Sequence, residues 1–560
     1  MKLFQQLLVA PAALGLIAPM AANAADLNIS GMSDYSDSAV SSYSTSGDQV
    51  TSINQFADVQ PYDWAYQALS NLIERYGCVA GYPSGSYLGN RAMTRFEAAA
   101  LLNACLDRVT EVTDELRRLL KEFEQELAVL KGRVDGLEAR VGELEATQFS
   151  TTTKLVGQAT FVVGANSYGG DAEDRFGRDR DDDASRSDGA TVFNYDLRLD
   201  LNTSFTGEDL LKTRLRAGNF GNSPFGGGGY VGLDAMEVAF GEEGDEDEVN
   251  IDRLYYQFPV GAEVTVTAGA KVRQDDMLAV WPSAYPADTI IDFFTYAGAP
   301  GAYSLTLGGG GGIWWENNGF SISASYVSAN ADNGNPNRDD AFVDATGGIG
   351  TDAAASNGTA QIAYATEQWG IAGAYSYTSG DNGAGLYAGN ATPLAVSLSE
   401  TGTTNSYGVS AWWSPEDSGW WPSISAGWGY NNINENNDSN FIDSAASQSW
   451  YVGLQWEGAF VEGNAFGFAV GQPTFVTAVD YDSDVTPSDD DDFVADGNYA
   501  FELWYKFQVT DNISVTPAVF YLSRPLGDIT EGGGPAFGGG RGDDNHFHNF
   551  GGLVKTTFKF

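Results

Sequence analysis

The chain has 560 residues, a formal net charge of −46, and 68 Gly, 27 Tyr, 31 Phe and 13 Trp. So acidic a chain repels phosphate groups, which excludes a general electrostatic affinity for nucleic acid. The length allows several domains, and the aromatic content supplies residues that favour strands and interfaces.

Residues 1–24 have the features of a signal peptide. Lys2 precedes an apolar run over residues 7–17, and the small-x-small site at residues 22–24 predicts cleavage after it. No later stretch approaches the ~20 uninterrupted apolar residues of a membrane helix. If the exported chain resides in a membrane, it must therefore do so as a β-barrel. Residues 25–54 are rich in Ser, Asp, Gly and Thr and predict a disordered leader.

Residues 55–109 carry four sequence blocks in a fixed order. They are Phe-x-Asp-Val at 56–59, a Trp-Ala-Tyr helix that begins at Trp64, a Gly-Tyr-Pro loop at 81–83 and a Thr-Arg-x-Glu helix start at 94–97. This segment resembles one copy of the S-layer homology (SLH) domain. The resemblance implies binding to a wall polysaccharide attached to peptidoglycan.

The resemblance places Asp63, Trp64 and Arg95 at the wall-binding groove. An arginine fork can hold the carboxylate of an acidic sugar, and an indole can stack on a sugar ring. For Trp64, packing in the domain core is the alternative.

Cys78 and Cys105 are the only cysteines of the chain, and both lie in the SLH segment. In an exported protein this pair predicts a disulfide between the Gly-Tyr-Pro loop and the second helix. Two separate buried thiols are the alternative. Two cysteines alone do not predict a metal site.

Residues 110–147 predict a coiled coil. Apolar residues step by three and four from Val109 to Leu144, with one stutter at Phe123 and Leu127. A single amphipathic helix lying on its own barrel or domain is the alternative. Three glycines weaken the helix by ~1 kcal/mol each, so self-association would have to supply stability. One wall-binding copy joined to such a helix suggests a homotrimer, because three SLH copies often work together.

Residues 149–560 predict a mainly β fold, a transmembrane antiparallel β-barrel. Short alternating segments are broken by Gly, Asn, Asp and Pro, and tight turns alternate with long polar insertions at 169–188, 330–357 and 482–492. About 410 residues at roughly ten per strand plus loops favour 16 strands. A soluble sandwich is the alternative.

The last segment predicts the closing strand of this barrel. Phe550, Val554, Phe558 and Phe560 share one parity, and Lys555 and Lys559 share the other. Because successive side chains of a strand point to opposite faces, the strand has one apolar and one cationic face.

Basic residues at the inward parity of the barrel predict a cationic, pore-lining stripe. The neighbouring residues Leu211, Leu215, Leu254 and Val272 take the lipid-facing parity. The stripe comprises Arg198, Lys212, Arg214, Arg216, Arg253, Lys271, Arg273 and Lys555. A one-signed stripe would screen permeants by charge. The alternative is that these cations pair with acidic groups of a loop folded into the lumen.

No motif indicates catalysis, a cofactor or a metal. The two histidines, His546 and His548, are too few for a catalytic or metal site without further partners. The glycine runs at 226–229 and 308–312 lack the Lys and Ser/Thr of a phosphate-binding loop.

The order of signal peptide, SLH domain, coiled coil and barrel ending in Phe resembles the cyanobacterial outer-membrane porins of the carbohydrate-selective (OprB-like) family. Some members are called iron uptake porins. The resemblance implies a trimeric passive channel in the outer membrane, with the SLH domain and coiled coil in the periplasm. It implies three partners besides its own copies: outer-membrane lipid, peptidoglycan-linked polysaccharide and permeating solutes.

We therefore expect passive diffusion of small hydrophilic solutes, especially inorganic ions with iron as one candidate, and no enzyme activity. One alternative is a carbohydrate-selective channel in which Tyr255 and Trp504 form a stacking track. The other is a structural tether between membrane and wall whose barrel is plugged.

Overall fold

The computed structural model divides into two compact units, residues 1–147 and 148–560. The signal peptide, the leader, Asp63, Cys78, Arg95 and Cys105 lie outside the described residues. The described residues are 64, 66–68, 98–99, 102, 114–129 and 152–560, without 175–176, 242–246, 287–288, 338–345, 417–418, 436–441, 482–491, 495 and 531–545.

In the first unit, helix α5 (Asp114–Glu122) is followed by further helical residues at 124–129. The amides of Phe123 and Leu127 bond to carbonyls four residues earlier, so the helix continues through the predicted stutter. Leu119 and Phe123 are fully buried by the chain itself. The coiled coil over residues 110–147 stays a prediction, because most of its seam lies outside the described residues.

Among the described residues, no helix has both the length and the apolar character needed to cross a bilayer.

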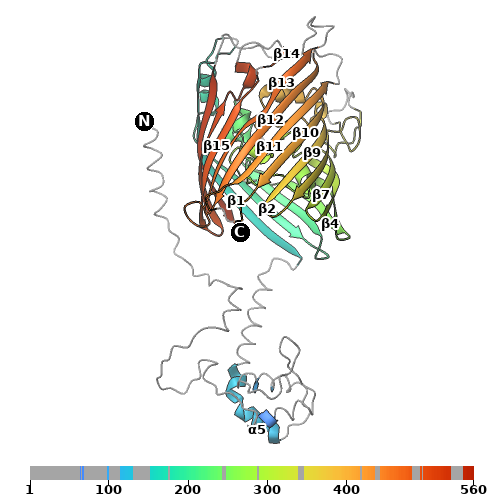
Figure 1. Ribbon diagram of the computed structural model, residues 1–560, viewed down its shortest axis with the longest axis vertical. Coiled ribbons are helices and arrows are strands. Elements are labelled where there is room, and N and C mark those ends of the chain that lie inside the picture. Colours follow the sequence, from blue (N-terminus) through green and yellow to red (C-terminus); the bar gives the residue numbers. More distant parts are fainter. Residues whose placement is uncertain are drawn as a thin grey trace. The chain divides into compact units, whose positions relative to one another are not determined.

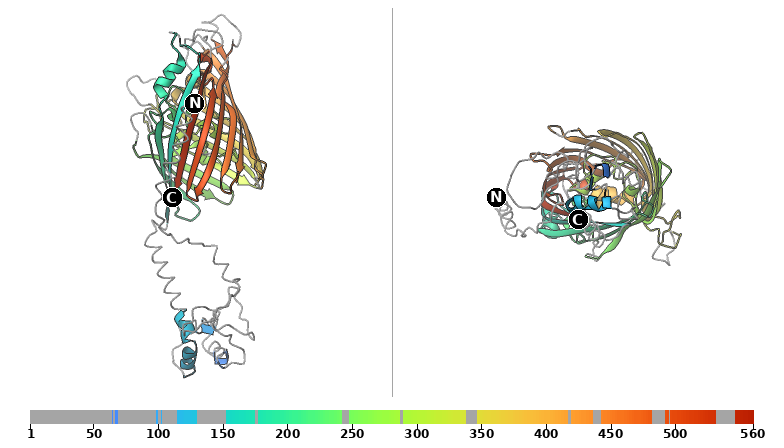
Figure 2. Two further views of the ribbon diagram at one scale, coloured as in Figure 1. Left: turned by 90° about the vertical axis from the view of Figure 1, so that its left-hand side faces the viewer. Right: turned by 90° about the horizontal axis from the view of Figure 1, so that it is seen from below.

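The described part of the second unit contains one antiparallel sheet of 17 strands that closes on itself (Figure 1). Strand β14 (Asp492–Phe493) is a two-residue addition, which leaves sixteen barrel strands, as predicted. Closure occurs at β1 (Thr153–Gly170), which pairs with both β2 and β17. Figure 2 shows the barrel from below, around its lumen.

The remaining strands are β2 (Val192–Thr203), β3 (Leu210–Gly218), β4 (Asn250–Val260), β5 (Val264–Arg273), β6 (Leu307–Asn317), β7 (Phe320–Ser328), β8 (Ser356–Ala365), β9 (Trp369–Ser379), β10 (Gly402–Trp413), β11 (Ser423–Glu435), β12 (Ile442–Glu457), β13 (Ala465–Tyr481), β15 (Tyr499–Thr510), β16 (Ile513–Ser523) and β17 (Phe547–Lys559).

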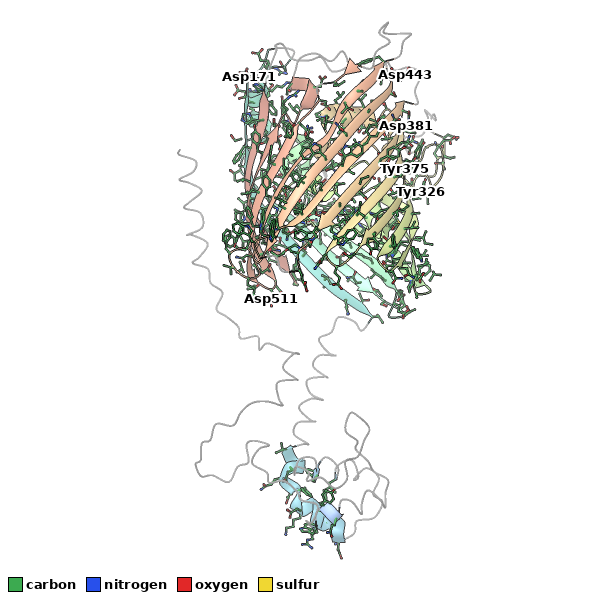
Figure 3. All side chains as sticks on the ribbon, in the orientation of Figure 1. Asp171, Tyr326, Tyr375, Asp381, Asp443 and Asp511 are labelled. Carbon is green, nitrogen blue, oxygen red and sulfur yellow. The ribbon has the colours of Figure 1, made fainter. Side chains whose placement is uncertain are left out.

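Short turns join the strands at one end of the barrel and long loops join them at the other. The turns include 261–263, 318–319 and 511–512, and β1 begins and β17 ends at the same end. Figure 3 labels Asp511 at the short-turn end and Asp171 at the long-loop end. The predicted asymmetry of turns and loops is confirmed.

The long loops carry short helices. They are α7 (Arg180–Asp188) after β1, η4 (Pro224–Gly226) and η5 (Gly232–Asp234) after β3, η6 (Gln274–Met277) and η7 (Asp292–Thr295) after β5, η8 (Gly380–Asn382), η9 (Ala388–Asn390) and α8 (Pro393–Ser399) after β9, and η10 (Gly527–Thr530) after β16.

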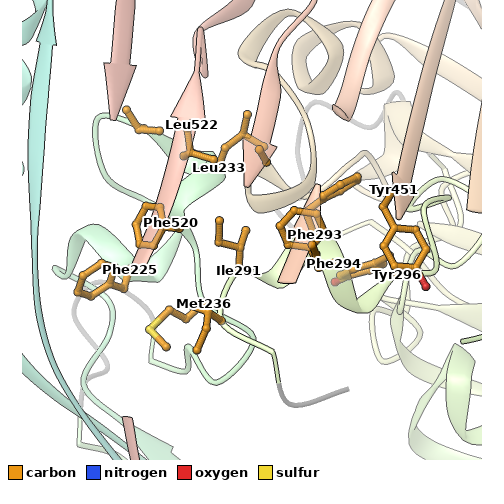
Figure 4. Packing of buried hydrophobic residues seen from close by; sticks show 14 of the residues in the cluster. Phe225, Leu233, Met236, Ile291, Phe293, Phe294, Tyr296, Tyr451, Phe520 and Leu522 are labelled. Atoms are coloured by element: carbon orange, nitrogen blue, oxygen red, sulfur yellow. The ribbon is translucent and has the colours of Figure 1, made fainter. Parts of the chain in front are cut away.

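The main hydrophobic core lies inside the barrel, where two loops meet the inner wall (Figure 4). The β3–β4 loop (219–249) and the β5–β6 loop (274–306) join through an antiparallel bridge between Met236 and Ile291. The core includes Phe225, Leu233, Phe293 and Phe294 from the loops and Tyr451, Phe520 and Leu522 from the wall. Each such buried side chain contributes ~1.5–3 kcal/mol, so both loops are fixed parts of the lumen.

Strand β17 has the alternation expected of the closing strand. Phe550 and Val554 are exposed on the outer face, whereas Lys555 is buried on the inner face. Phe560 exchanges two backbone hydrogen bonds with Gly157 of β1, at 2.6 and 2.9 Å. Its ring covers Gly157 so closely that a Cβ there would lie 2.2 Å from a ring carbon. The terminal aromatic residue therefore seals the last seam of the barrel.

Candidate permeation pathway

Most of the predicted basic residues gather on the inner face of adjacent strands β2 to β5. The register places Arg198 of β2 opposite Arg216 of β3, and Arg214 opposite both Asp200 and Arg253. On these strands the inward-facing basic residues alternate with apolar residues that are exposed or half-buried, as the sequence predicts.

These cations are paired with carboxylates, so the predicted one-signed stripe is wrong. Arg216 bonds Asp196 at 2.7 Å and Arg214 bonds Asp200 at 2.7 Å. Lys212 lies 3.7 Å from Asp200. Arg198 bonds Asp196 at 2.6 Å and approaches Glu237 of the β3–β4 loop at 3.4 Å. Arg253 bonds Asp252 at 3.0 Å and Asp276 at 2.8 Å, and Arg273 bonds Asp275 at 2.5 Å.

We call this set the ionic ladder. It combines six cations with six carboxylates, and three of the carboxylates, Glu237, Asp275 and Asp276, come from loops folded into the lumen. The alternative of pairing with an inserted loop is thus confirmed for these three. The members are Arg198, Lys212, Arg214, Arg216, Arg253, Arg273, Asp196, Asp200, Glu237, Asp252, Asp275 and Asp276.

Lys271 does not belong to the ladder, because β5 has a register shift between Gly269 and Val272. Val272 is fully buried in a cluster with Tyr255. Lys271 is exposed and pairs in register with exposed Leu254. Since cross-strand partners share a face, Lys271 points away from the lumen and Val272 into it. The predictions that Lys271 faces the lumen and that Val272 faces the lipid are therefore wrong. Both assumed an uninterrupted alternation along β5, and the bulge breaks this alternation.

Lys555 faces inward as predicted, but it holds a loop instead of lining an open passage. Its side chain is buried, and Nζ donates to the carbonyl of Thr289 at 3.0 Å. Nearby, Glu502 of β15 accepts from the Tyr285 hydroxyl and from the Ile291 amide, both at 2.8 Å. These contacts fix the β5–β6 loop to the wall formed by β15 and β17.

The inner face of β7 to β12 carries hydroxyl and amide side chains, and the β5–β6 loop lies against it. Ser425 accepts from the amides of Ala284 and Tyr285 at 2.8 and 2.9 Å. Ser449 donates to the carbonyl of Gly298 at 2.8 Å. Glycine lets the backbones approach, since a Cβ at Gly427 would lie 1.8 Å from a loop carbonyl.

We call this surface the hydroxyl wall. Its members are no more than 5% exposed. They are Ser321, Ser323, Thr359, Gln361, Ser376, Thr404, Ser406, Ser410, Ser425, Asn431, Ser447 and Ser449.

Most members of the ionic ladder keep contact with solvent, whereas the hydroxyl wall does not; Arg216, Arg253, Asp196 and Asp252 are the buried members. The side chains of Arg198, Lys212 and Arg214 are 16%, 19% and 18% exposed, and that of Arg273 is 29% exposed. The inner wall along β2 to β5 therefore presents solvent-accessible charged side chains beside the two inserted loops.

Three loops converge near the ladder. Glu237 comes from the β3–β4 loop, Asp292 from η7 of the β5–β6 loop, and Tyr387 precedes η9 and donates to the carbonyl of Gly226 at 2.9 Å. Burial, reinforced by the nearby charge of Glu237, raises the pKa of Asp292 to about 7. The carboxyl group can thus change its charge near neutral pH.

The predicted aromatic stacking track is not accessible. Tyr255 is buried and donates to Asp276 at 3.3 Å. Trp504 is buried beneath the β5–β6 loop and donates to the Tyr285 hydroxyl at 2.9 Å. Both rings take part in packing, which leaves neither face free for a sugar.

In the first unit, Trp64 is half-buried and the guanidinium of Arg118 lies 4.0 Å from its ring centroid. A cation over an indole face is a favourable arrangement. One face of the predicted wall-binding indole is therefore occupied by α5.

Sequence reasoning missed the carboxylates of the ladder. Asp196 and Asp200 stand at the same inward parity as Arg198, so their alternation contained the signal. Asp275 follows Arg273 by two residues, so this pairing was also visible in the sequence. For Glu237, and for the contact of Asp276 with Arg253, no local signal existed, because loop folding brings these carboxylates to the wall. Within the described part of the chain, no group of three or more His, Cys, Asp or Glu side chains could hold a metal ion.

Comparison with known proteins gives two family matches. Residues 111–560 match the carbohydrate-selective porin, OprB family, and residues 55–99 match the S-layer homology domain. An uncharacterized protein of Nostoc sp. is 36% identical over 85% of this chain and 82% of its own length. One of Synechocystis sp. is 29% identical over 91% of each.

The structure of Pseudomonas putida OprB at high pH is similar with a TM-score of 0.45 and 13% identity. The match covers 75% of this chain and 96% of that chain.

Proposed function

The chain belongs to the carbohydrate-selective porin (OprB) family and is an outer-membrane porin, and from this premise we propose that small hydrophilic solutes, inorganic ions among them, diffuse passively through it along the ionic ladder. One observation carries the proposal. Eight of the twelve ladder side chains are partly exposed, among them those of Arg198, Lys212 and Arg214, whereas the hydroxyl wall is covered.

A ladder of alternating charges suits polar permeants of either sign. Each guanidinium supplies several donors in a fixed fork and each carboxylate supplies acceptors, so a permeant that loses part of its hydration shell finds replacement partners. Because the charges balance within the ladder, we expect moderate ion selectivity instead of exclusion of one sign. Iron remains one candidate among the ions.

Two other functions have support from specific observations. The family description favours a carbohydrate as the solute, and the ladder's donors and acceptors could bind sugar hydroxyls without a stacking track. The bridge between Met236 and Ile291, which ties two inserted loops together inside the barrel, favours a plugged tether.

Planar-bilayer recording with the full-length protein separates these functions. We expect stepwise conductance in simple salt. Insertion of folded barrels that pass no current would favour the tether. Oligosaccharides that reduce the current at submillimolar concentration would favour the carbohydrate channel.

We further propose that the SLH domain binds peptidoglycan-linked polysaccharide in the periplasm through Asp63, Trp64 and Arg95, and that the protein is a homotrimer. The match over residues 55–99 supports the first point. Pull-down by isolated wall sacculi tests it: Arg95→Ala should abolish binding.

Cross-linking in native membranes tests the trimer. A thiol assay tests the predicted disulfide: protein kept without reductant should have no free thiols if Cys78 and Cys105 are bonded.

A further inference from the structure

A second polar feature lies on the inner wall at the short-turn end, apart from the ionic ladder. It is a cavity of about 280 Å³ on strands β15 to β17, around the turn that contains Asp511 and Asn512. Figure 3 labels Asp511 at this end of the barrel. The volume is close to the lower limit of small-molecule sites, which is enough for a small ion and part of its hydration shell.

Two lysines, Lys506 of β15 and Lys559 of β17, give the cavity its charge. Asp511 is the one carboxylate among the described lining residues. Every cation of the ionic ladder has a carboxylate within 4 Å, but among the described residues neither lysine has an ion-pair partner. In a chain of net charge −46, this cavity thus brings together two lysines without an ion-pair partner among the described residues.

The carboxylate of Phe560 directly follows Lys559 in the sequence, so its position decides whether it can pair with that lysine. Phe560 directs its backbone oxygen to the amide of Gly157 on β1, at 2.6 Å. Strand β1 and strand β16 pair with opposite edges of β17. The oxygen of Phe560 that bonds Gly157 therefore points toward β1, on the edge of β17 opposite to β16.

The remaining lining groups can donate hydrogen bonds. Ser514 supplies a hydroxyl and Asn512 an amide, and the Asn512 carbonyl accepts from the Lys559 amide at 2.8 Å, which fixes the turn against β17. Lys506 is level with Thr516, which pairs with Lys555, so Lys506 and Lys559 lie on either side of the row formed by Gln508, Ser514 and Thr557. Each lysine is one strand and two residues away from Ser514, which places its Cα ~8 Å from that of Ser514. Two long lysine side chains can reach a common oxyanion across that distance.

We propose that this cavity is an anion-binding site at the short-turn mouth of the barrel, for a small oxyanion such as phosphate or for the phosphate group of a phosphorylated solute. The ammonium groups of Lys506 and Lys559 neutralise the anion, and Ser514 and Asn512 complete its hydrogen bonds. The inward parity of Thr557 and Lys559 places the site in the lumen, so its ligand is a dissolved anion and not a lipid headgroup. Binding here does not require that the barrel conduct.

Isothermal titration of inorganic phosphate into the detergent-solubilised full-length protein tests the site. We expect saturable binding that sulfate competes for, and at least about tenfold weaker binding for Lys506→Gln with Lys559→Gln, as expected for loss of hydrogen bonds to a charged group. The matched control is Lys121→Gln with Lys271→Gln, which removes two exposed lysines elsewhere and should leave the affinity unchanged.

Either of two results would overturn the proposal: no saturable binding by the unmodified protein at millimolar phosphate, or equal binding by the double variant. If the double variant does not fold, Lys559→Gln alone decides. Its side chain is exposed at the end of β17, and its loss should still weaken binding severalfold.

Discussion

Two halves of the same inner wall are both polar, but they differ in what covers them. The hydroxyl wall on β7 to β12 is buried under the β5–β6 loop, whereas eight of the twelve members of the ionic ladder on β2 to β5 stay partly solvated. A neutral hydroxyl can satisfy one backbone group at a small desolvation cost, but an ion pair loses several kcal/mol per ion when it is fully buried. The difference indicates that the kind of polar residue on each strand decides where a loop can pack and where water remains.

The largest expected effect on stability comes from removing one ion-pair partner of the ionic ladder. Arg216→Met leaves Asp196, whose side chain is fully buried, with Arg198 as its remaining cation. Loss of a buried ion-pair partner should lower the free energy of unfolding by about 3–5 kcal/mol. Urea unfolding in detergent micelles measures this. Ser376→Ala on the hydroxyl wall is the control, and an equal loss in both variants would erase the distinction.

A smaller effect is expected on the hydroxyl side. Ser425→Ala removes the acceptor of two loop amides, those of Ala284 and Tyr285. Leaving such buried amides unpaired costs about 1–3 kcal/mol and should loosen the β5–β6 loop. Hydrogen exchange of residues 279–286 should rise severalfold. Unchanged protection there would mean that Ser425 does not hold the loop.

The two halves also account for what could be predicted from the sequence. The closed barrel, the turn and loop asymmetry and the inward face of β17 follow from period-two alternation and turn residues, which are local properties. The pairing of Arg253 with Asp276 and the reversal at Lys271 and Val272 depend on bulges and loop folding. No local pattern contains that information. The sequence therefore indicated the basic residues of the inner wall, but not the loop carboxylates Glu237 and Asp276 that pair with them.

Ion selectivity sharpens the comparison without unfolding the protein. Arg214→Glu removes one positive charge from the accessible wall and adds one negative charge. An electrostatic energy of about 1 kcal/mol corresponds to a roughly fivefold rise in the ratio of cation to anion permeability. Reversal potentials in a salt gradient measure it. Lys271→Glu makes the same charge change on the outer face and should leave the ratio unchanged. A shift of equal size in both variants would count against a path along the ladder.

The smallest expected effect is pH dependence. Because the pKa of Asp292 is raised to about 7, its carboxyl group is largely protonated at pH 6 and ionised at pH 8. Raising the pH across this range adds a negative charge beside Glu237, Arg273 and Tyr296, so cation preference should increase modestly. Asp292→Asn should remove this change. A pH response that persists in Asp292→Asn would assign it to another group.

The central claim, that water and solutes follow the ionic ladder and not the hydroxyl wall, is tested most directly by thiol accessibility under voltage. Lys212→Cys and Ser376→Cys place one thiol on each half, and the unmodified protein controls for Cys78 and Cys105. Charged methanethiosulfonate reagent should reduce the single-channel current of Lys212→Cys and leave that of Ser376→Cys unchanged. Block of Ser376→Cys with an unaffected Lys212→Cys would contradict the account.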